Sequence, residues 1–342
     1  MSEHDLSAGG DVLTRVTGCA RDALAAYGVH PAASVELLNV SYDPTRELWR
    51  AINAAFTTAY ARQTGEQVTI NMSHGGSSSQ ARAVIDGLAA DVVTLALWPD
   101  VDAIRRAGLI EPGWEQRFPN HAVPYTSTAV FVVRKGNPKG IHDWPDLVRP
   151  GVEVVTPNPK TSGNGKVTFL AAWGSVVTRG GSPEAAAAYV KQLYAHVPVL
   201  DLGARASSVT FVQKQIGDVH VTWENEAYLE LDEAHGAVDI VYPPTSFLAE
   251  PPVAVVDAND KRRGTGAVAK AYLDFVFSDA GQRIIAEHRY RPIKPVPDGP
   301  TFPALERFPI TAIAKDWDDA AARFFADGAL FDRIYGPGER TP

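Results

Sequence analysis

Three stretches of this sequence place glycine or hydroxyl-bearing residues directly before a predicted helix: residues 41–44, 73–78 and 161–165. The first backbone N–H groups of a helix have no partner within the helix, and serine hydroxyls add further donors. Glycines let the backbone approach an oxyanion closely. Several such stretches brought together would bind a small anion. Any one of them taken alone is more often a simple helix cap.

An alternating pattern of strands and helices would bring these stretches to one place. Short apolar runs predict strands at residues 35–40, 68–72 and 92–97. Between the first two runs, Asp43 and Pro44 are typical of a helix start and Gly65 of a helix end. This order predicts a parallel sheet covered by helices. In such a sheet, ligands bind beyond the carboxyl ends of the strands, beside helix N-termini.

The same pattern resumes in the middle of the chain. Further strands are predicted at residues 129–133, 152–156, 197–200 and 219–222. A polar loop at 201–208 precedes another predicted helix, and a strand at 253–256 is followed by a long helix at 269–288. No stretch has the composition of a linker. We therefore expect two α/β lobes interwoven by crossing segments rather than two consecutive domains.

Length and composition limit the class of protein. The chain has 342 residues, of which 45% are hydrophobic and 21% charged, which is typical of a folded protein of about two domains. The net charge of −8 argues against a nucleic-acid partner. No apolar run reaches the roughly 18 residues of a membrane-spanning helix. The single cysteine, Cys19, excludes an intramolecular disulfide and a Cys-rich metal site.

Motifs of catalysis are incomplete in this sequence. It contains neither G-x-S-x-G nor H-E-x-x-H. Residues 163–166 resemble part of a P-loop, but Val167 stands where Ser or Thr is required. Residues 264–266 resemble half of a dinucleotide-binding motif, but a charged run separates them from their strand. We expect no catalytic residues, no metal site and no enzymatic activity.

The first 34 residues are predicted to form an extension that is helical or mobile. No basic segment followed by an apolar core is readable there, so the sequence shows no signal peptide. Residues 16–19, which end at Cys19, resemble the motif around the cysteine that is lipidated in lipoproteins. The residues before this motif are too polar for an export signal.

Several blocks of the sequence, in order, resemble one known family, the periplasmic sulfate-binding proteins of sulfate/thiosulfate ABC importers. The blocks are residues 39–47, 73–77, 90–97, 124–128, 132–139, 156–160, 170–174, 203–205, 223–227 and 290–292. The resemblance runs from about residue 35 to residue 334, so it covers nearly the whole chain after the extension.

The resemblance implies a two-lobed periplasmic-binding-protein fold of type II. Each α/β lobe would contain a mixed, mostly parallel sheet flanked by helices, with a hinge between the lobes. Residues 35–122 and 250–342 would form the first lobe, and residues 123–249 the second. The family implies a monomer in the periplasm that uses no cofactor, captures sulfate between the lobes and delivers it to a membrane permease. Alternatives are thiosulfate or another tetrahedral oxyanion as the main ligand, or a regulatory or sensory role.

The resemblance also implies the groups that bind the anion. They would be the backbone N–H groups of Asp43, Ser77, Gly163, Asn164 and Ala204, the hydroxyls of Ser77 and Ser162, and the indole N–H of Trp223. Asn164 stands where the family usually has a glycine, which keeps the N–H but affects pocket width. Behind the pocket, His74 is predicted to anchor its loop, and Arg205 either supports the pocket or caps a helix.

The chemistry of such a pocket would favour sulfate. Sulfate carries no proton at neutral pH and needs donors only, whereas phosphate keeps a proton and benefits from an acceptor. A pocket of N–H and O–H groups without a lining carboxylate therefore selects sulfate. The Asp43 carboxylate is accordingly predicted to point away from the anion, and Glu224 and Glu226 are predicted to be surface or hinge residues.

Overall fold

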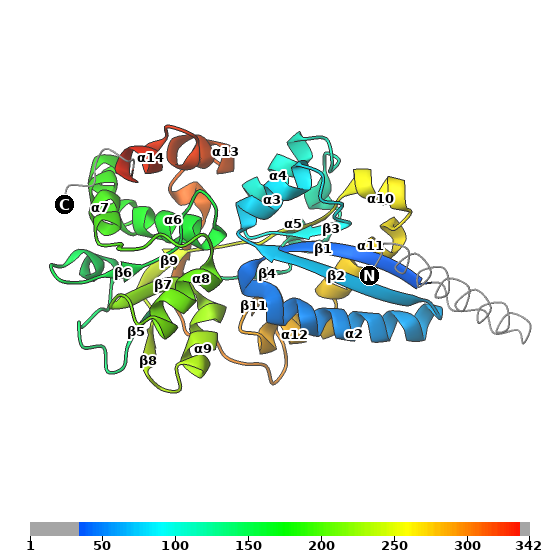
Figure 1. Cartoon of the computed structure of the whole chain (residues 1–342), viewed down its shortest axis with the longest axis horizontal. Helices are drawn as coiled ribbons and strands as arrows, with labels where there is room; N and C mark the ends of the chain where they lie inside the picture. The colour runs from blue at the N-terminus through cyan, green and yellow to red at the C-terminus, as the bar shows by residue number, and fades with distance from the viewer. Residues whose placement is uncertain (1–33, 336–342) are drawn as a thin grey trace, which may run out of the picture.

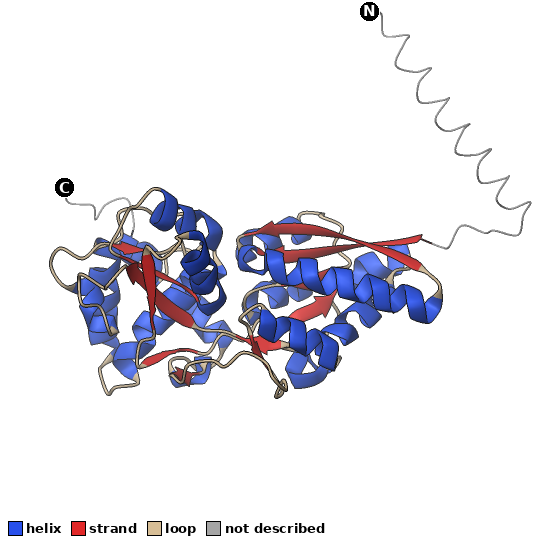
Figure 2. Cartoon of the chain, turned by 90° about the horizontal axis from the view of Figure 1, so that it is seen from below, coloured by secondary structure: helices blue, strands red, loops and turns tan. Residues whose placement is uncertain are grey.

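The computed structural model describes residues 34–335, which form two lobes lying side by side (Figures 1 and 2). The sheet of the first lobe has the strand order β10-β3-β1-β2. Strand β1 is parallel to both β2 and β3, and β10 is antiparallel to β3. The strands are β1 (Ser34–Tyr42), β2 (Gln67–Gly75), β3 (Val92–Thr94) and β10 (Val253–Val255). The carboxyl ends of β1, β2 and β3 meet at one edge, as the alternating pattern predicted.

Helices cover both faces of this sheet. Figure 1 shows α3 and α4 on one face and α2 and α12 on the other. Leu48, Ile52 and Phe56, spaced four residues apart on α2, are buried against the sheet. The helical segments of this lobe are η1 (Asp43–Thr45), α2 (Arg46–Thr64), α3 (Ser77–Ile85), α4 (Trp98–Arg106), η2 (Trp114–Gln116), α5 (Pro119–Ala122), α10 (Asp257–Arg263), α11 (Gly266–Phe277) and α12 (Asp279–Glu287).

The second lobe is built on a sheet of order β6-β7-β5-β8. Strand β6 is parallel to β7, whereas β5 is antiparallel to β7 and β8. This sheet is therefore mixed but mostly antiparallel, which corrects the prediction of a mostly parallel sheet in each lobe, because β5 runs against both of its neighbours. The strands are β5 (Ala129–Arg134), β6 (Val154–Val155), β7 (Val219–Trp223) and β8 (Val238–Val241). The helical segments of this lobe are η3 (Trp144–Val148), α6 (Gly163–Val177), α7 (Pro183–Ala195), α8 (Ala204–Ser208), η4 (Val209–Gln213) and α9 (Glu224–Glu233).

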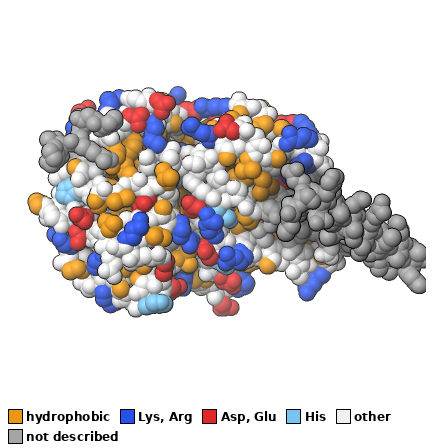
Figure 3. Space-filling model, viewed as in Figure 1, with side chains coloured by type: hydrophobic (Ala, Val, Ile, Leu, Met, Phe, Trp, Pro, Cys, Tyr) orange, Lys and Arg blue, Asp and Glu red, His pale blue; other side chains and the backbone are white. Residues whose placement is uncertain are grey.

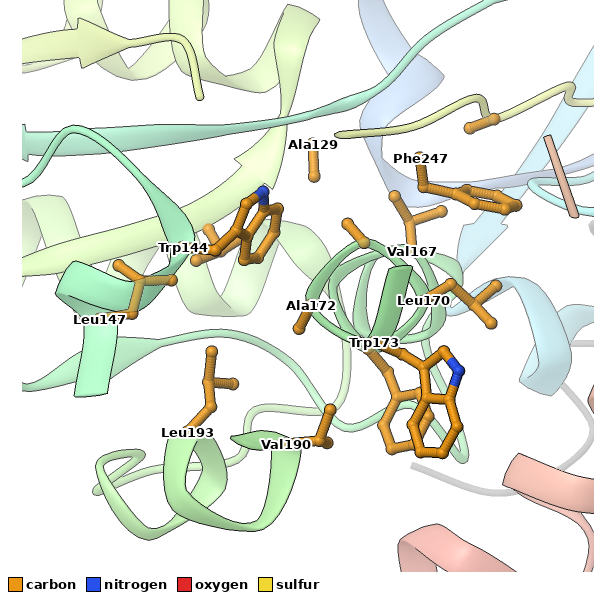
Figure 4. Packing of buried hydrophobic residues seen from close by; sticks show 14 of the residues in the cluster. Ala129, Trp144, Leu147, Val167, Leu170, Ala172, Trp173, Val190, Leu193 and Phe247 are labelled. Atoms are coloured by element: carbon orange, nitrogen blue, oxygen red, sulfur yellow. The ribbon is translucent and has the colours of Figure 1, made fainter. Parts of the chain in front are cut away.

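Helix α6 is the centre of the second lobe. All of its residues from Gly163 to Ser175 are buried. Figure 4 shows Val167, Leu170 and Trp173 projecting from α6 in different directions, with α7 packed alongside. A helix that is enclosed on all sides holds its first turn in a fixed place, and that turn faces the other lobe.

The chain passes between the lobes along extended segments. Strand β4 (Tyr125–Thr126) pairs with β11 (Arg291–Pro292), and β9 (Thr245–Phe247) pairs with β12 (Glu306–Phe308). A further bridge joins Ser127 to Ala249. These paired crossings connect the lobes without a flexible linker, as the sequence predicted.

The C-terminal segment lies on the second lobe. Phe308, Phe324 and Phe331 pack in the same hydrophobic cluster as Phe169 and Trp173 of α6, and Figure 1 shows α13 and α14 beside α6 and α7. This corrects the predicted assignment of all of residues 250–342 to the first lobe, because the aromatic side chains after the last crossing bury their surface against α6. The elements are η5 (Ile310–Ala312), α13 (Trp317–Ala320), η6 (Ala321–Phe325) and α14 (Leu330–Tyr335).

Two local predictions were wrong. Residues 197–200 do not form a strand. The helix predicted at 269–288 is divided into α11 and α12 at Ser278, whose backbone is extended and whose hydroxyl accepts from the Gly281 N–H at 3.2 Å. The predicted N-terminal extension, with Cys19, lies outside the described residues except for its last residue, Ser34, which begins β1. Within residues 34–335, no helix is both long and apolar enough to cross a membrane.

Candidate anion-binding site

A small, narrow cavity lies between the two lobes. All seven residues predicted to bind an anion line it. They are Asp43 and Ser77 of the first lobe, and Ser162, Gly163, Asn164, Ala204 and Trp223 of the second. The structure therefore brings together residues that are spread over about half of the chain.

Four helical segments begin at this cavity. The first lobe contributes η1, which begins at Asp43, and α3, which begins at Ser77. The second lobe contributes α6, which begins at Gly163, and α8, which begins at Ala204. The N–H groups of a first turn have no partner within the helix and carry partial positive charge. The cavity therefore offers hydrogen-bond donors from both lobes.

The indole of Trp223 supplies the clearest sign of a ligand. The side chain is fully buried, and its ring lies 5.6 Å from the ring of Tyr42, centroid to centroid. Its Nε1–H has no hydrogen-bond partner in the described part of the chain. A buried donor without an acceptor costs about 1–3 kcal/mol, so such groups are usually matched to a partner. Here the cavity is the place where an acceptor could bind.

Ser162 retains a hydroxyl proton for a ligand. It is the N-cap of α6, and its Oγ accepts from the Gly165 N–H at 3.4 Å. Because accepting this bond leaves the hydroxyl proton available, Ser162 can cap the helix and donate into the cavity at once.

The hydroxyl of Ser77 is engaged differently from the prediction. It donates to Oδ2 of Asp100 at 2.6 Å and accepts from the Ala96 N–H at 3.0 Å. A buried carboxylate within reach is a strong acceptor, which explains why the hydroxyl bonds to it. The backbone N–H of Ser77 remains in the first turn of α3, at the cavity.

Two cavity residues have their side chains occupied elsewhere. The Asp43 carboxylate accepts from Arg46 at 2.7 Å and lies so close to Gly203 that a Cβ there would be 2.6 Å from its Oδ2. The Asn164 amide donates to the Val221 carbonyl at 3.4 Å, although its Oδ1 is buried without a partner. For both residues, the backbone N–H is the group suited to an anion.

His74 and Arg205 lie outside the cavity lining. The ring of His74 lies 3.4 Å from the Tyr42 carbonyl, and burial lowers its pKa, as does the nearby charge of Arg46. Its position fits the predicted loop anchor. Arg205 links the two lobes, because its guanidinium contacts Glu47 of α2 and Glu226 of α9, each at 3.1 Å.

Glu224 and Glu226 are both buried. The sequence had predicted that they are surface or hinge residues, and the structure excludes a surface position. Glu224 is held by Arg291 through two hydrogen bonds of 2.7 and 2.8 Å, next to the crossing strand β11. Burial raises the pKa of Glu226 to about 8, with Glu230 and Glu47 acting in the same direction and Arg205 opposing them. Both carboxylates are therefore part of the region that joins the lobes.

Sequence reasoning missed Asp100 and Lys166. Asp100 lies in the first turn of α4, directly after the predicted strand 92–97, and Lys166 lies in the first turns of α6. For Asp100, the available signal was a charged residue that closely follows a strand of the sheet. In the described part of the chain, no group of His, Cys, Asp and Glu side chains is arranged to hold a metal ion.

Comparison with known proteins places this chain in a family. The model for bacterial extracellular solute-binding proteins matches residues 38–291, which is most of the chain. The chain belongs to that family. Among its relatives are the thiosulfate-binding protein of Pseudomonas aeruginosa, 48% identical over 310 residues, and the sulfate-binding protein of Escherichia coli, 49% identical over 310 residues. These alignments cover 89% of this chain and 93% and 94% of the respective relatives.

Solved structures of solute-binding proteins agree with this fold. The sulfate-binding protein SubI of Mycobacterium tuberculosis is 31% identical, with a TM-score of 0.77 over 85% of this chain and 99% of SubI. A periplasmic thiamin-binding protein, 19% identical with a TM-score of 0.61, shares the fold alone. The predicted two-lobed fold and the predicted family are thus confirmed.

Proposed function

We propose that this protein captures sulfate in the cavity between its lobes. The observation that carries the proposal is the buried Trp223 Nε1–H, a donor without a protein acceptor, in a cavity where helical segments of both lobes begin. The relatives named as sulfate-binding proteins, at 49% identity, support the same ligand.

The donors around the cavity explain why sulfate is favoured over phosphate. Phosphate at neutral pH carries a proton and needs an acceptor, whereas sulfate needs donors only. Asp43 is a cavity residue, and its carboxylate accepts a hydrogen bond from Arg46. Hydrogen bonds to a charged group contribute about 1.5–3 kcal/mol each, so a handful give micromolar or tighter binding.

Thiosulfate is the second candidate ligand, since a relative named as a thiosulfate-binding protein is 48% identical. Thiosulfate is tetrahedral and doubly charged, so the same donors could bind it. Calorimetric titration of extensively dialysed protein with sulfate, thiosulfate, phosphate and molybdate tests both candidates. One-to-one binding of sulfate that phosphate does not match supports the proposal. Stronger binding of thiosulfate than of sulfate would make thiosulfate the main ligand. No binding of any of the four anions would refute both candidates.

Delivery to an ABC importer follows from this role. We infer that the protein acts as a monomer in the periplasm, needs no cofactor, catalyses no reaction and presents sulfate to a membrane permease. Adding the sulfate-loaded protein to membranes that contain the cognate importer should stimulate ATP hydrolysis, whereas the same protein without sulfate should not. Tight sulfate binding without any such stimulation would favour a sensory or regulatory role.

A further inference from the structure

The carboxylate of Asp100 lies at the junction of the two lobes, behind the cavity. It accepts from the hydroxyl of Ser77 at 2.6 Å and from the hydroxyl of Ser78 at 2.9 Å, both in α3 of the first lobe. It also accepts from the ammonium of Lys166, in α6 of the second lobe, at 2.8 Å. Asp100 is buried, and neither it nor Lys166 lines the cavity.

The ion pair of Lys166 and Asp100 depends on the closed arrangement of the lobes. The lysine side chain is only 11% exposed, and its Nζ contacts both Asp100 and the Ser78 hydroxyl, each at 2.8 Å. Because the partners belong to different lobes, separating the lobes would break these contacts. The negative charge of Asp100 is therefore paired with Lys166 only when the lobes are together.

The single hydroxyl proton of Ser77 has two competing acceptors. Ser77 is one of the cavity residues, and its Oγ accepts a hydrogen bond from the Ala96 N–H at 3.0 Å. Rotation of the Ser77 hydroxyl about its C–O bond then decides which acceptor the proton points to. It can be donated to Asp100 or to an oxygen of the bound anion, but not to both. The outcome of this competition depends on how strongly the Asp100 carboxylate attracts the Ser77 proton. A carboxylate that already accepts hydrogen bonds from other donors is a weaker acceptor for one more.

We propose that Asp100 and Lys166 are positioning residues that control the Ser77 hydroxyl. When the lobes close, Lys166 engages Asp100 and weakens its hold on the Ser77 proton. The hydroxyl donates to Asp100 in this arrangement and turns to the anion once an anion oxygen is within reach. Closure and anion binding are thereby coupled although the lysine does not touch the ligand. The inference rests on the proposed anion-binding function and adds two residues that determine affinity.

A double-mutant cycle tests this coupling. Sulfate affinity is measured by titration calorimetry for the wild type, Lys166→Met, Ser77→Ala and the double variant. We expect Lys166→Met to weaken binding about tenfold in the wild type and by less than about twofold when Ser77 is already alanine, since residues in one network couple. Lys166→Arg should restore most of the affinity because it keeps the charge and the donors.

Two further variants separate this role from a structural one. Lys160→Met removes a cation that pairs with Asp327 and Asp332 and does not contact Asp100, so its sulfate affinity should equal that of the wild type. The pair Asp100→Asn with Lys166→Met removes both charges and should bind sulfate better than Lys166→Met alone. Thermal unfolding without ligand shows whether each variant is folded.

The possible results distinguish the role of Lys166 from anion binding itself. An equal loss of affinity on Lys166→Met with and without the Ser77 hydroxyl would overturn the inference, because Lys166 would then act by long-range attraction of the anion. Wild-type protein that binds sulfate while the cycle is additive overturns this inference alone. Wild-type protein that binds no tetrahedral anion overturns the proposed function and this inference with it.

Discussion

Gly76 of the first lobe lies directly against the backbone of Thr161 of the second lobe. A Cβ on Gly76 would be 2.3 Å from the Thr161 carbonyl oxygen and 3.2 Å from that of Leu202. The backbone of Gly76 has φ −61° and ψ 133°, a conformation that any residue adopts. The glycine is therefore required by the closeness of the two lobes and not by the local turn. Gly163 is similar, since a Cβ there would be 2.3 Å from the Ala96 Cβ.

Gly76→Ala should hinder closure of the lobes. We expect it to weaken sulfate binding about tenfold or more, because a methyl group forced into a packed contact costs about 1–3 kcal/mol. Titration calorimetry measures this loss. The neighbouring Gly75→Ala, also at the cavity, is the matched control, because the nearest atoms to a Cβ there belong to the Gln80 side chain, at an ordinary contact distance of 3.5 Å. Equal affinities in the two variants would contradict a closed, tightly packed binding state.

Trp223→Phe should remove one donor from the cavity while keeping the ring against Tyr42. The loss of a hydrogen bond to a charged ligand predicts binding about tenfold weaker or more. Trp144→Phe is the control, because that indole donates to the Thr245 carbonyl at 2.8 Å inside the second lobe. The control should lose stability and keep its sulfate affinity. The site assignment fails if Trp223→Phe and Ser162→Ala both bind as tightly as the wild type.

Asn164→Gly should leave sulfate affinity within about threefold of the wild type, a difference below 1 kcal/mol. The reason is that glycine keeps the backbone N–H, and the Asn164 amide bonds to Val221. The measurement is again calorimetric titration, with thiosulfate as a second ligand. A change of an order of magnitude for either anion would show that the side chain itself contacts the ligand or sets the width of the cavity.

Glu226 should make stability depend on pH. Its pKa is raised from an ordinary 4.5 to about 8 by burial, so between these values the folded protein keeps a proton that the unfolded chain has lost. The stabilisation is complete below pH 4.5 and is lost as pH rises to about 8. Relative to Glu226→Gln, the wild type should lose about 1–3 kcal/mol of unfolding free energy between pH 5 and pH 8. Parallel pH profiles of the two proteins in urea unfolding would disprove the raised pKa.

Arg291 should be important for stability because it neutralises the buried Glu224. Arg291→Met leaves this carboxylate without its partner and should destabilise the protein by about 3–5 kcal/mol. Urea unfolding measures the loss. Arg179→Met, which breaks an exposed pair with Asp143, should cost less than about 1 kcal/mol. If the two variants are equally stable, the pair of Arg291 and Glu224 contributes no more to the free energy of unfolding than a surface ion pair does.

Much of this protein could be predicted from local sequence patterns. Asp43 and Pro44 begin a helical segment, and Gly65 ends α2 with a left-handed φ of 77°. The seven predicted ligand-binding residues line one cavity because most of them lie at strand-to-helix junctions. Parallel strands place such junctions at a shared edge, so a pattern readable along the chain is enough to bring them together.

The tertiary structure decided the partners of the charged and polar side chains. Lys166 is 66 positions from Asp100, Arg291 is 67 from Glu224, and Arg205 is 158 from Glu47. The assignment of Phe308 and the residues after it to the second lobe likewise depends on distant contacts. Hydrophobic periodicity shows which face of a segment is buried but not against what it is buried. The sequence alone therefore determined the elements and the donor-rich junctions, and only the folded chain determined which groups compete for the Ser77 proton and hold the lobes together.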